Sequence, residues 1–371
     1  MITDKRGLYV HIPFCLKKCD YCDFCSYVGV STDLRRRYIS ALADEIKSYK
    51  RNERIVLDSI FFGGGTPTLL SEAELSLIVG AIKDSFILDK NLEFTFEANP
   101  KTLDSEKCRA LKEHGVNRIS IGLQSIHENE LKGLGRIHTF SDFLHSYKLC
   151  REYFDNISVD LMYGIPEQTK ESFEKTLKEI LLLNPNHISV YGLILEEGTP
   201  LYTSHKYMKM PSEDEECDMY YLAARILGEC GFSHYEISNY AKAGFESRHN
   251  LKYWQMDEYI GVGLTAASCF DSKRYVNTGD FEEYFECIKG KYPRNYESID
   301  ATYEYAMLGL RLKSGISLSE YREIFDVDFL LGREEKIQKF TDSKLIEISH
   351  GRLHLTESGF YVSNYILSEL L

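Results

Sequence analysis

Residues 11–22 read His11-Ile12-Pro13-Phe14-Cys15-Leu16-Lys17-Lys18-Cys19-Asp20-Tyr21-Cys22. The three cysteines have the spacing C-x3-C-x2-C and follow an apolar run, residues 8–12, that is typical of a strand. An ordinary four-iron cluster takes four cysteine thiolates. Three thiolates on one short loop therefore predict a [4Fe-4S] cluster with one iron that has no protein ligand. An open metal position is where a metal site can bind a reactant.

Two simpler interpretations of these cysteines compete with the cluster. Closely spaced cysteines often bind zinc, but zinc sites usually need four ligands, commonly arranged as two separated pairs. A disulfide is typical of secreted proteins, and no signal-peptide pattern precedes this loop. The spacing favours the cluster and leaves both alternatives open.

Composition limits the class of protein and its partners. The chain has 371 residues, of which 43% are hydrophobic, enough for a large domain and a smaller one. It has no apolar run long enough to predict a transmembrane segment. The net charge of −13 argues against nucleic acid or anionic lipid as the main partner. The cysteines outside the first loop show no pairing pattern, as expected in a reducing, cytoplasmic compartment.

Strand and helix patterns alternate along the first half of the chain. The expected strands are 8–12, 59–62, 92–97, 118–123, 157–162 and 188–193, and the expected helices are 33–52, 72–86, 104–114, 140–154 and 170–183. Ser71 and Glu74 have the spacing of a capping box at the start of the second helix. A series of βα units implies a parallel sheet with right-handed crossovers.

The two faces of these strands differ in polarity. One face is apolar, whereas the other carries polar residues, among them Glu97, Gln124 and Asp160 at the carboxyl ends. A doubly wound sheet would be apolar on both faces, and a filled barrel would pack Val, Ile and Leu inside. The pattern instead predicts an α/β fold with a partial (β/α)6 barrel that holds a polar ligand. The alternative is that these are buried polar residues with satisfied hydrogen bonds.

We divide the chain into three segments. Residues 1–205 form the barrel, residues 206–295 form a less regular extension with few clear strands that closes it, and residues 296–371 form a C-terminal module. Helical patterns in the module precede alternating runs around His350-Gly351, which predict a hairpin and a winged-helix-like arrangement. Such modules often bind DNA, but the acidic chain lacks a basic stripe.

The run Gly63-Gly64-Gly65-Thr66-Pro67-Thr68 follows the second expected strand. Glycines let a backbone approach a ligand closely and present amide groups to it, although many such runs are simply turns. The run lacks the Gly-Lys-Ser/Thr ending of a phosphate-binding loop.

Several motifs together resemble those of a known superfamily. They are residues 9–15 (YVHIPFC), 63–68 (GGGTPT), 97–100 (EANP), 121–125 (IGLQS) and 160–166 (DLMYGIP). With them the chain resembles the radical S-adenosylmethionine (SAM) superfamily and, within it, the oxygen-independent coproporphyrinogen III oxidase-like family, over nearly its whole length. The resemblance implies that SAM occupies the open iron through its amino and carboxylate groups, and that an electron from the cluster releases a deoxyadenosyl radical. The residues it implies for SAM are Tyr9, Gly64, Gly65, Thr66 and Glu97, with Cys15, Cys19 and Cys22 on the metal. For SAM or a second SAM molecule it implies Tyr21, Gln124, Arg136, Asp160, Ile194 and Ala267.

Two departures from the oxidases resemble the shorter, HemW-type heme chaperone branch of that family. The oxidases have a fourth cysteine where this chain has Phe24, and they have a long N-terminal arm where only eight residues precede Tyr9. The nearby Cys25 is either an unusual fourth ligand or a bystander thiol that oxidises readily. We favour the bystander, because Cys22 and Cys25 would compete for the same iron edge.

The marker of the branch is an H-N-x-x-Y-W run, found here at residues 249–254. Its link to heme implies that His249, Tyr253 and Trp254 bind heme, with His or Tyr as the iron ligand and Trp against the porphyrin face. The alternative is a structural aromatic corner in which His249 is a satisfied hydrogen-bonding residue.

The resemblance thus implies a heme chaperone that binds heme and delivers it to acceptor hemoproteins while retaining a [4Fe-4S] cluster and SAM. One alternative is a radical enzyme that decarboxylates coproporphyrinogen III, and another is a radical enzyme that opens or methylates heme. Whether the chain is an enzyme stays open. The family's chemistry also allows an electron donor such as flavodoxin or ferredoxin, and a homodimer.

Overall fold

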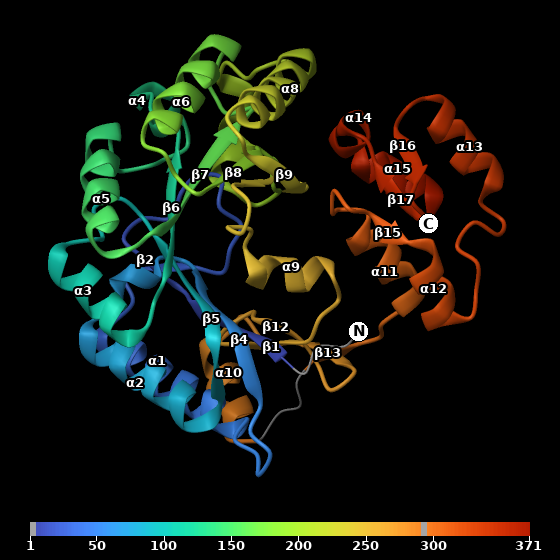
Figure 1. The fold of residues 1–371 in the computed structure, drawn as a ribbon. Coiled ribbons are helices and arrows are strands. Elements are labelled where there is room, and N and C mark those ends of the chain that lie inside the picture. Colours follow the sequence, from blue (N-terminus) through green and yellow to red (C-terminus); the bar gives the residue numbers. More distant parts are fainter. Residues whose placement is uncertain (1–4, 291–294) are drawn as a thin grey trace.

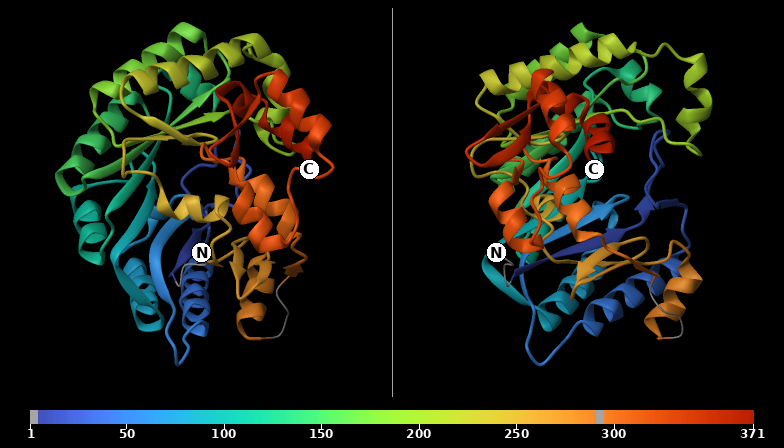
Figure 2. Two further views of the ribbon diagram at one scale, coloured as in Figure 1. Left: turned by 45° about the vertical axis from the view of Figure 1, so that its right-hand side comes forward. Right: turned by 90° about the vertical axis from the view of Figure 1, so that its right-hand side faces the viewer.

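The computed structural model describes residues 5–290 and 295–371. Its main element is a twelve-stranded sheet, whose central strands are parallel and follow one another in chain order. These strands are β1 (Lys5–Ile12), β4 (Val56–Gly64), β5 (Ile87–Ala98), β6 (Arg118–Gln124), β7 (Asn156–Tyr163) and β8 (His187–Gly192). The sheet curves, and β9 and β14 lie at its two ends (Figures 1 and 2). The predicted succession of βα units and the partial barrel are confirmed.

Helices cover the outer face of the curved sheet (Figure 2). They are α1 (Thr32–Ser48), α2 (Glu72–Ser85), α3 (Ser105–His114), α4 (Glu128–Gly133), α5 (Phe140–Tyr153), α6 (Lys170–Leu182) and α8 (Glu213–Glu229). The apolar strand residues, such as Leu8, Val10 and Phe96, are fully buried beneath them. The capping box of Ser71 and Glu74 is present at the start of α2. Burial of the apolar strand face leaves the polar face to line the lumen.

The segment before the C-terminal module is richer in strands than we expected. It supplies β9 (Ser233–Glu236), β10 (Asn239–Ala241), β11 (Tyr259–Val262), β12 (Ala267–Phe270) and β13 (Lys273–Val276). Strand β11 runs parallel to β1, with Tyr9 opposite Gly261, whereas the others pair antiparallel, as does β14 (Asn295–Glu297) with β13. The expectation of few strands is wrong, because these strands are short and two of their pairings, β11 with β1 and β10 with β8, join distant parts of the chain.

Short strands and helices lie between the larger elements of this part of the chain. They are β2 (Phe14–Cys15), β3 (Tyr27–Val28), η1 (Pro67–Leu69), α7 (Pro200–Ser204), η2 (His205–Tyr207), α9 (Arg248–Trp254) and α10 (Phe281–Ile288). Helix α9 carries the H-N-x-x-Y-W run and lies near the amino ends of the parallel strands. The backbone amides of Arg248 and His249 each donate to the carboxylate of Glu93 in β5 at 3.0 Å.

The C-terminal module contains the predicted helices and hairpin. Its elements are α11 (Ala301–Gly309), β15 (Ile316–Ser317), α12 (Leu318–Phe325), α13 (Glu334–Asp342), β16 (Ile346–Ser349), β17 (Arg352–Leu355), α14 (Glu357–Tyr361) and α15 (Ser363–Leu370). Strand β15 joins the hairpin in a three-stranded sheet. Tyr220 of α8 packs into the core of this module, and His234 in β9 contacts Glu357 at 3.2 Å. The module is therefore packed against the end of the main sheet.

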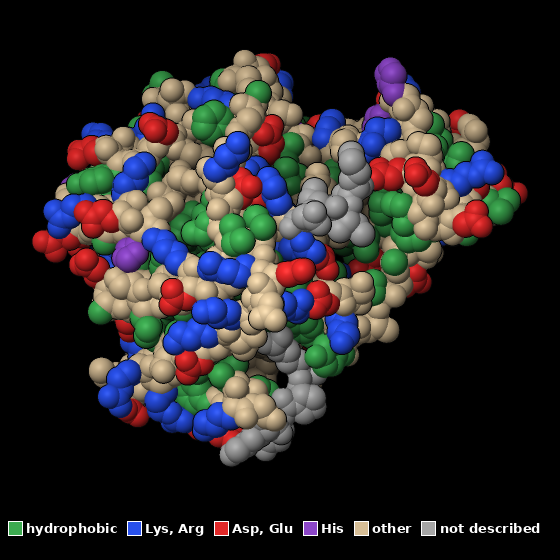
Figure 3. All heavy atoms as spheres, turned by 60° about the horizontal axis from the view of Figure 1, so that its bottom comes forward, with side chains coloured by type: hydrophobic (Ala, Val, Ile, Leu, Met, Phe, Trp, Pro, Cys, Tyr) green, Lys and Arg blue, Asp and Glu red, His purple; other side chains and the backbone are tan. Residues whose placement is uncertain are grey.

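Basic and acidic side chains are interspersed over the face shown in Figure 3. This face thus has a mixed charge. Over the described ranges, 5–290 and 295–371, no helix is long and apolar enough to cross a membrane.

Candidate functional site

The cysteine loop follows β1 and is held by backbone hydrogen bonds from two directions. The amide of Gly65 donates to the carbonyl of Ile12 at 2.8 Å, which ties the glycine turn to the start of the loop. Midway along the loop, Asp20 donates its amide to the carbonyl of Leu134 at 3.0 Å and accepts from the amide of Leu201 at 2.8 Å. These contacts fix the loop before any ligand binds, as a preorganised site requires.

A cavity of about 330 Å³, here called the outer cavity, opens beside this loop. Many of the residues that the sequence analysis named line it together: Cys15, Cys19, Cys22, Tyr21, Gly64, Gly65, Glu97, Gln124, Arg136 and Asp160. The cysteines and Tyr21 belong to the loop, and Arg136 lies outside the strands. The other residues come from the carboxyl ends of β4, β5, β6 and β7, where barrel proteins place their sites.

Hydrogen-bond donors approach two of the three thiols. Arg136 Nη1 lies 3.4 Å from Cys19 Sγ, and Thr66 Oγ1 donates to Cys15 Sγ at 3.6 Å. Burial raises the pKa of the Cys15 and Cys22 thiols above the ordinary value. Hydrogen bonds to sulfur stabilise the metal-bound thiolate and help to set the potential of a cluster.

These residues fit a four-iron cluster better than a single ion. Within the part of the chain that the structure describes, no three His, Cys, Asp or Glu residues are grouped as ligands of one metal ion. A four-iron cluster asks for a wider arrangement, since each thiolate binds a different iron. Cys25 does not line the outer cavity, and its thiol lies 3.8 Å from the hydroxyl of Tyr27.

The glycine turn leaves no room for side chains beside the loop. A Cβ atom at Gly65 would lie 2.8 Å from the carbonyl oxygen of Phe14 and 3.0 Å from Cys15 Sγ. Gly64 has a φ of +106°, and a Cβ atom there would lie 2.5 Å from the ring of His11. The turn therefore needs glycine for backbone conformation and for its close approach to the loop.

We expect Gly64→Ala to lower the free energy of unfolding by about 2–4 kcal/mol, because it combines an unfavourable φ with a clash against His11. Gly80→Ala is the matched control, since a Cβ atom at Gly80 in α2 meets nothing within 4 Å. It should stabilise the helix by about 0.5–1 kcal/mol. Chemical denaturation of both variants measures the effect, and equal stabilities would contradict the constraint at Gly64.

Two carboxyl groups share the boundary between the cavities. Glu97 accepts from the amide of Gly64 at 3.2 Å, and Asp160 accepts from Ser120 Oγ at 3.1 Å. Burial, together with the nearby charge of Asp160, raises the pKa of Glu97 to about 8. Burial also raises the pKa of Asp160. Glu97 is therefore protonated at neutral pH until a cationic ligand or a hydrogen-bond donor favours its ionised form.

We expect the free energy of unfolding to fall as the pH rises from 4.5, the ordinary pKa of a glutamate carboxyl, to about 8, the pKa of Glu97 in the folded protein. The raised pKa means that the folded state binds this proton more tightly than the unfolded state. We expect Glu97→Gln to abolish this pH dependence. Its free energy of unfolding should exceed that of the wild type by roughly 1–3 kcal/mol at pH 8 and differ little from it at pH 4.5. Urea unfolding across this pH range, without added SAM, tests the expectation. A constant difference between the two proteins would show that Glu97 titrates normally.

Arg136 and Gln124 present unused polar atoms to the outer cavity. Arg136 Nη2 donates to Asn99 Oδ1 at 2.7 Å, which orients the guanidinium. Arg136 Nε and Gln124 Oε1 are buried and have no hydrogen-bond partner among residues 5–290 and 295–371. Gln124 has a φ of +73°, at a register shift that ends β6. A ligand with both a carboxylate and an amino group, such as SAM, could satisfy both atoms.

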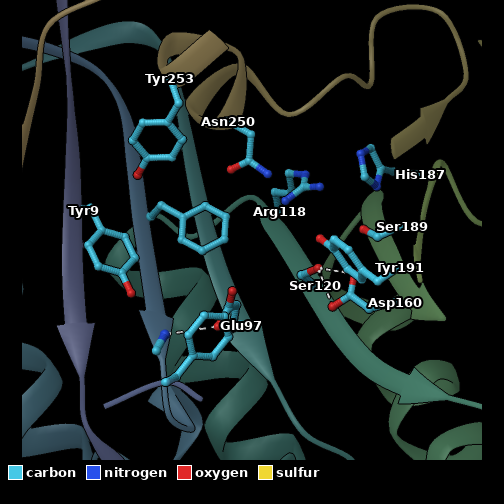
Figure 4. A pocket seen from close by; sticks show the side chains of 13 residues that line it. Tyr9, Glu97, Arg118, Ser120, Asp160, His187, Ser189, Tyr191, Asn250 and Tyr253 are labelled. Carbon is cyan, nitrogen blue, oxygen red and sulfur yellow. Dashed lines mark hydrogen bonds between the residues drawn. The ribbon is translucent and has the colours of Figure 1, made fainter. Parts of the chain in front are cut away.

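A second cavity of about 200 Å³, here called the inner cavity, continues into the lumen (Figure 4). It shares Gly64, Glu97, Ser120, Asp160 and Tyr191 with the outer cavity, so the two lie side by side. Tyr9 is in its wall, as are Asn250 and Tyr253, which both come from α9.

His249 is fully buried in a complete set of contacts. Its Nδ1 lies 3.0 Å from Ser59 Oγ, its Nε2 lies 2.8 Å from the hydroxyl of Tyr253, and its ring stacks on Phe61 with centroids 5.3 Å apart. Burial lowers the pKa of His249 to about 3, so the ring is neutral. With both nitrogens engaged, the geometry favours the structural interpretation of His249 over iron ligation.

Several residues implied by the resemblance lie away from the two cavities. Thr66 contacts Cys15 from the side, and Ile194 exposes 69% of its surface. Ala267 begins β12, beside Gly261 of β11. The ring of Trp254 lies under the guanidinium of Arg311, 5.7 Å from it, at the junction with the C-terminal module. The structure does not bring these four side chains into either cavity.

Other lining residues were not singled out as site residues from the sequence. Among them are Asn99 in the outer cavity, Arg118, His187 and Asn250 in the inner cavity, and Ser120 and Tyr191 in both. The alternation that places Ser120 inside the lumen also places Arg118 there, so strand periodicity was a usable indication. Asn250 belongs to the H-N-x-x-Y-W run, but no periodicity shows which end of the barrel a short helix occupies.

A curved parallel sheet with a three-cysteine loop at the carboxyl ends of its strands is typical of one class of proteins, and the comparisons with known families identify that class. Residues 9–180 match the model of the Radical SAM superfamily, and residues 296–362 match the HemN C-terminal domain. The fold matches that of coproporphyrinogen III oxidase (HemN) from Escherichia coli with a TM-score of 0.84 at 20% identity, covering 100% of this chain and 91% of that one.

Sequence comparison narrows the class. Proteins named heme chaperone HemW are 34% identical in Lactococcus lactis, covering 100% of this chain and 98% of the relative, and 36% identical in Bacillus subtilis, covering 99% of each. The chain therefore belongs to the HemW family of the radical SAM superfamily.

Proposed function

We propose that this protein binds heme and delivers it to acceptor hemoproteins, and that it holds a [4Fe-4S] cluster and SAM at the outer cavity. The observation that carries the cofactor part is the convergence of three thiols, the glycine turn, Glu97 and Arg136 on one cavity. The full-length similarity to relatives named heme chaperones supports the proposal that heme is the molecule delivered.

Each group at the outer cavity has a role in this proposal. When bound, such a cluster supplies an electron for reductive cleavage of SAM. Cys15, Cys19 and Cys22 would each hold one iron, Gly64 and Gly65 let the turn approach the cysteine loop closely, and Arg136 would bind a carboxylate. Glu97 holds a proton at neutral pH and can release it when a donor or a cation approaches.

The heme ligand is a separate question, because both ring nitrogens of His249 already make hydrogen bonds. Tyr253, whose hydroxyl lies against that ring and whose side chain lines the inner cavity, and the cysteine thiols are the other candidates.

Anaerobic incubation of the reconstituted protein with heme, or with coproporphyrinogen III plus reductant and SAM, tests the proposal. We expect roughly one heme per chain, seen as a shifted heme absorption band, and no conversion of coproporphyrinogen III. Conversion over many turnovers would replace the proposal with the oxidase function. Failure to bind heme would disprove the heme-binding part of the proposal. The cluster would still be tested separately, by the iron and sulfide content of the protein.

A further inference from the structure

The inner cavity contains a buried guanidinium that forms no ion pair with a residue the structure describes. Arg118, at the start of β6, exposes 2% of its surface and lines this cavity. Its one hydrogen bond within residues 5–290 and 295–371 runs from Nη1 to Thr95 Oγ1 at 3.5 Å, and its buried Nε has none. No carboxylate of those residues forms an ion pair with it. A buried charge in this state is unfavourable unless a ligand compensates it.

A second donor points into the same space from the opposite wall. Figure 4 shows the side-chain amide of Asn250 close to the guanidinium of Arg118. Asn250 lines the cavity, and its side chain makes no hydrogen bond to the described residues, whereas its backbone amide caps α9 on Ser247. The amide adds two N–H donors to those of the guanidinium.

Burial raises the pKa of both lumen carboxyl groups, Glu97 and Asp160, and the charge of Arg118 partly offsets this rise, but neither group forms an ion pair with it. Asp160 accepts from Ser120, and Glu97 accepts from Gly64 and is neutral at pH 7, since its pKa is raised to about 8. The other charged or titratable groups of the cavity wall are the neutral ring of His187, which is bonded to Ser158 and Tyr235, and the tyrosines. The donors at the inner end are thus available to a ligand.

We propose that Arg118 and Asn250 form a binding site for the carboxylate of an organic ligand that extends inward from the outer cavity. The guanidinium fork fits a carboxylate with two parallel hydrogen bonds, and Asn250 donates a third. The rings of Phe61, Tyr191 and Tyr253 give the site aromatic walls. Two ligands could present such a group, namely a heme propionate and the methionyl carboxylate of a SAM molecule. The site does not depend on heme being the cargo.

The test compares matched ligands with and without the carboxylate. Reconstituted wild type and Arg118→Met are titrated anaerobically with heme, heme dimethyl ester, SAM and decarboxylated SAM. We expect the wild type to prefer the free-acid form of one ligand pair by about tenfold or more, and Arg118→Met to lose that preference. Arg118→Lys keeps the charge without the fork and should retain part of the preference. Asn250→Asp, which adds a negative charge beside the guanidinium, should weaken the free-acid form alone.

Arg311→Met is the matched control, because Arg311 stacks on Trp254 and lines neither cavity, and it should change none of the four affinities. If Arg118→Met loses the preference for heme over its dimethyl ester, the site binds a heme propionate. If it loses the preference for SAM over decarboxylated SAM, the site binds the methionyl carboxylate. If both pairs bind Arg118→Met with the wild-type preference, or if the wild type has no preference in either pair, the site is overturned. If heme binds but neither the heme pair nor the SAM pair shows a carboxylate preference, this site is overturned and the proposed function stands.

Discussion

Cys19→Ser is expected to leave the reconstituted protein without its cluster, reducing about four irons per chain to nearly none. Iron–sulfur clusters are held by soft thiolates, and a serine hydroxyl at neutral pH offers neither the charge nor the polarisability of a thiolate. Cys19 lines the outer cavity between Cys15 and Cys22, and Arg136 directs an N–H group toward its sulfur at 3.4 Å. Two remaining thiolates on one loop would hold a cluster poorly.

The control for this experiment is Cys25→Ser. Cys25 lies outside the outer cavity and contacts the hydroxyl of Tyr27, so we expect this variant to keep its full iron and sulfide content. Iron, sulfide and zinc analyses of both variants give the answer. Wild-type protein that holds one zinc and no sulfide would disprove the cluster, and loss of iron in Cys25→Ser would make Cys25 a ligand.

The second large effect, on stability, is expected at His249 in α9, near the amino ends of the parallel strands. His249→Ala should lower the free energy of unfolding by about 3 kcal/mol, because it leaves a void against Phe61 and removes the partners of Ser59 and Tyr253. His145→Ala is the control, since His145 is exposed on α5 and its substitution should stay within about 0.5 kcal/mol of the wild type.

The same variant separates the two interpretations of the H-N-x-x-Y-W run. If His249 is structural, heme bound to His249→Ala under stabilising conditions should keep the wild-type absorption spectrum. A changed spectrum with undiminished stability would instead show that His249 ligates iron, which would require the ring to leave Ser59 and Tyr253.

The sequence was most informative where periodicity and local spacing decide the structure. Alternation along the strands separated the apolar outer face from the lumen, and it placed Glu97, Gln124 and Asp160 at the edge where the structure has its outer cavity. The cysteine spacing and the glycine turn belong to consecutive strand ends, so a parallel sheet necessarily brings them together.

Pairings between distant segments could not be read in this way. Strand β11 has four residues, and its position depends on β1 at the other end of the sequence. The spacing of the H-N-x-x-Y-W run fixes a helix face but not its position, and Glu93 and Ser59 place α9 at the amino ends of the strands. Ile194 and Ala267 rested on the resemblance alone, and no local pattern indicated where their side chains would lie.

The pairing of β1 with β11 has a consequence for how the chain is made. The ion pair of Arg6 with Glu258 joins residues 252 positions apart, so one edge of β1 stays without its neighbour while those residues are synthesised. At ordinary translation rates this takes roughly 10–50 s, during which the nascent strand presents an open edge. The cysteine loop leaves the ribosome early, attached to that incomplete strand. A truncated chain that stops before Tyr259 would contain every thiol of the loop and still lack β11, the strand that pairs with β1.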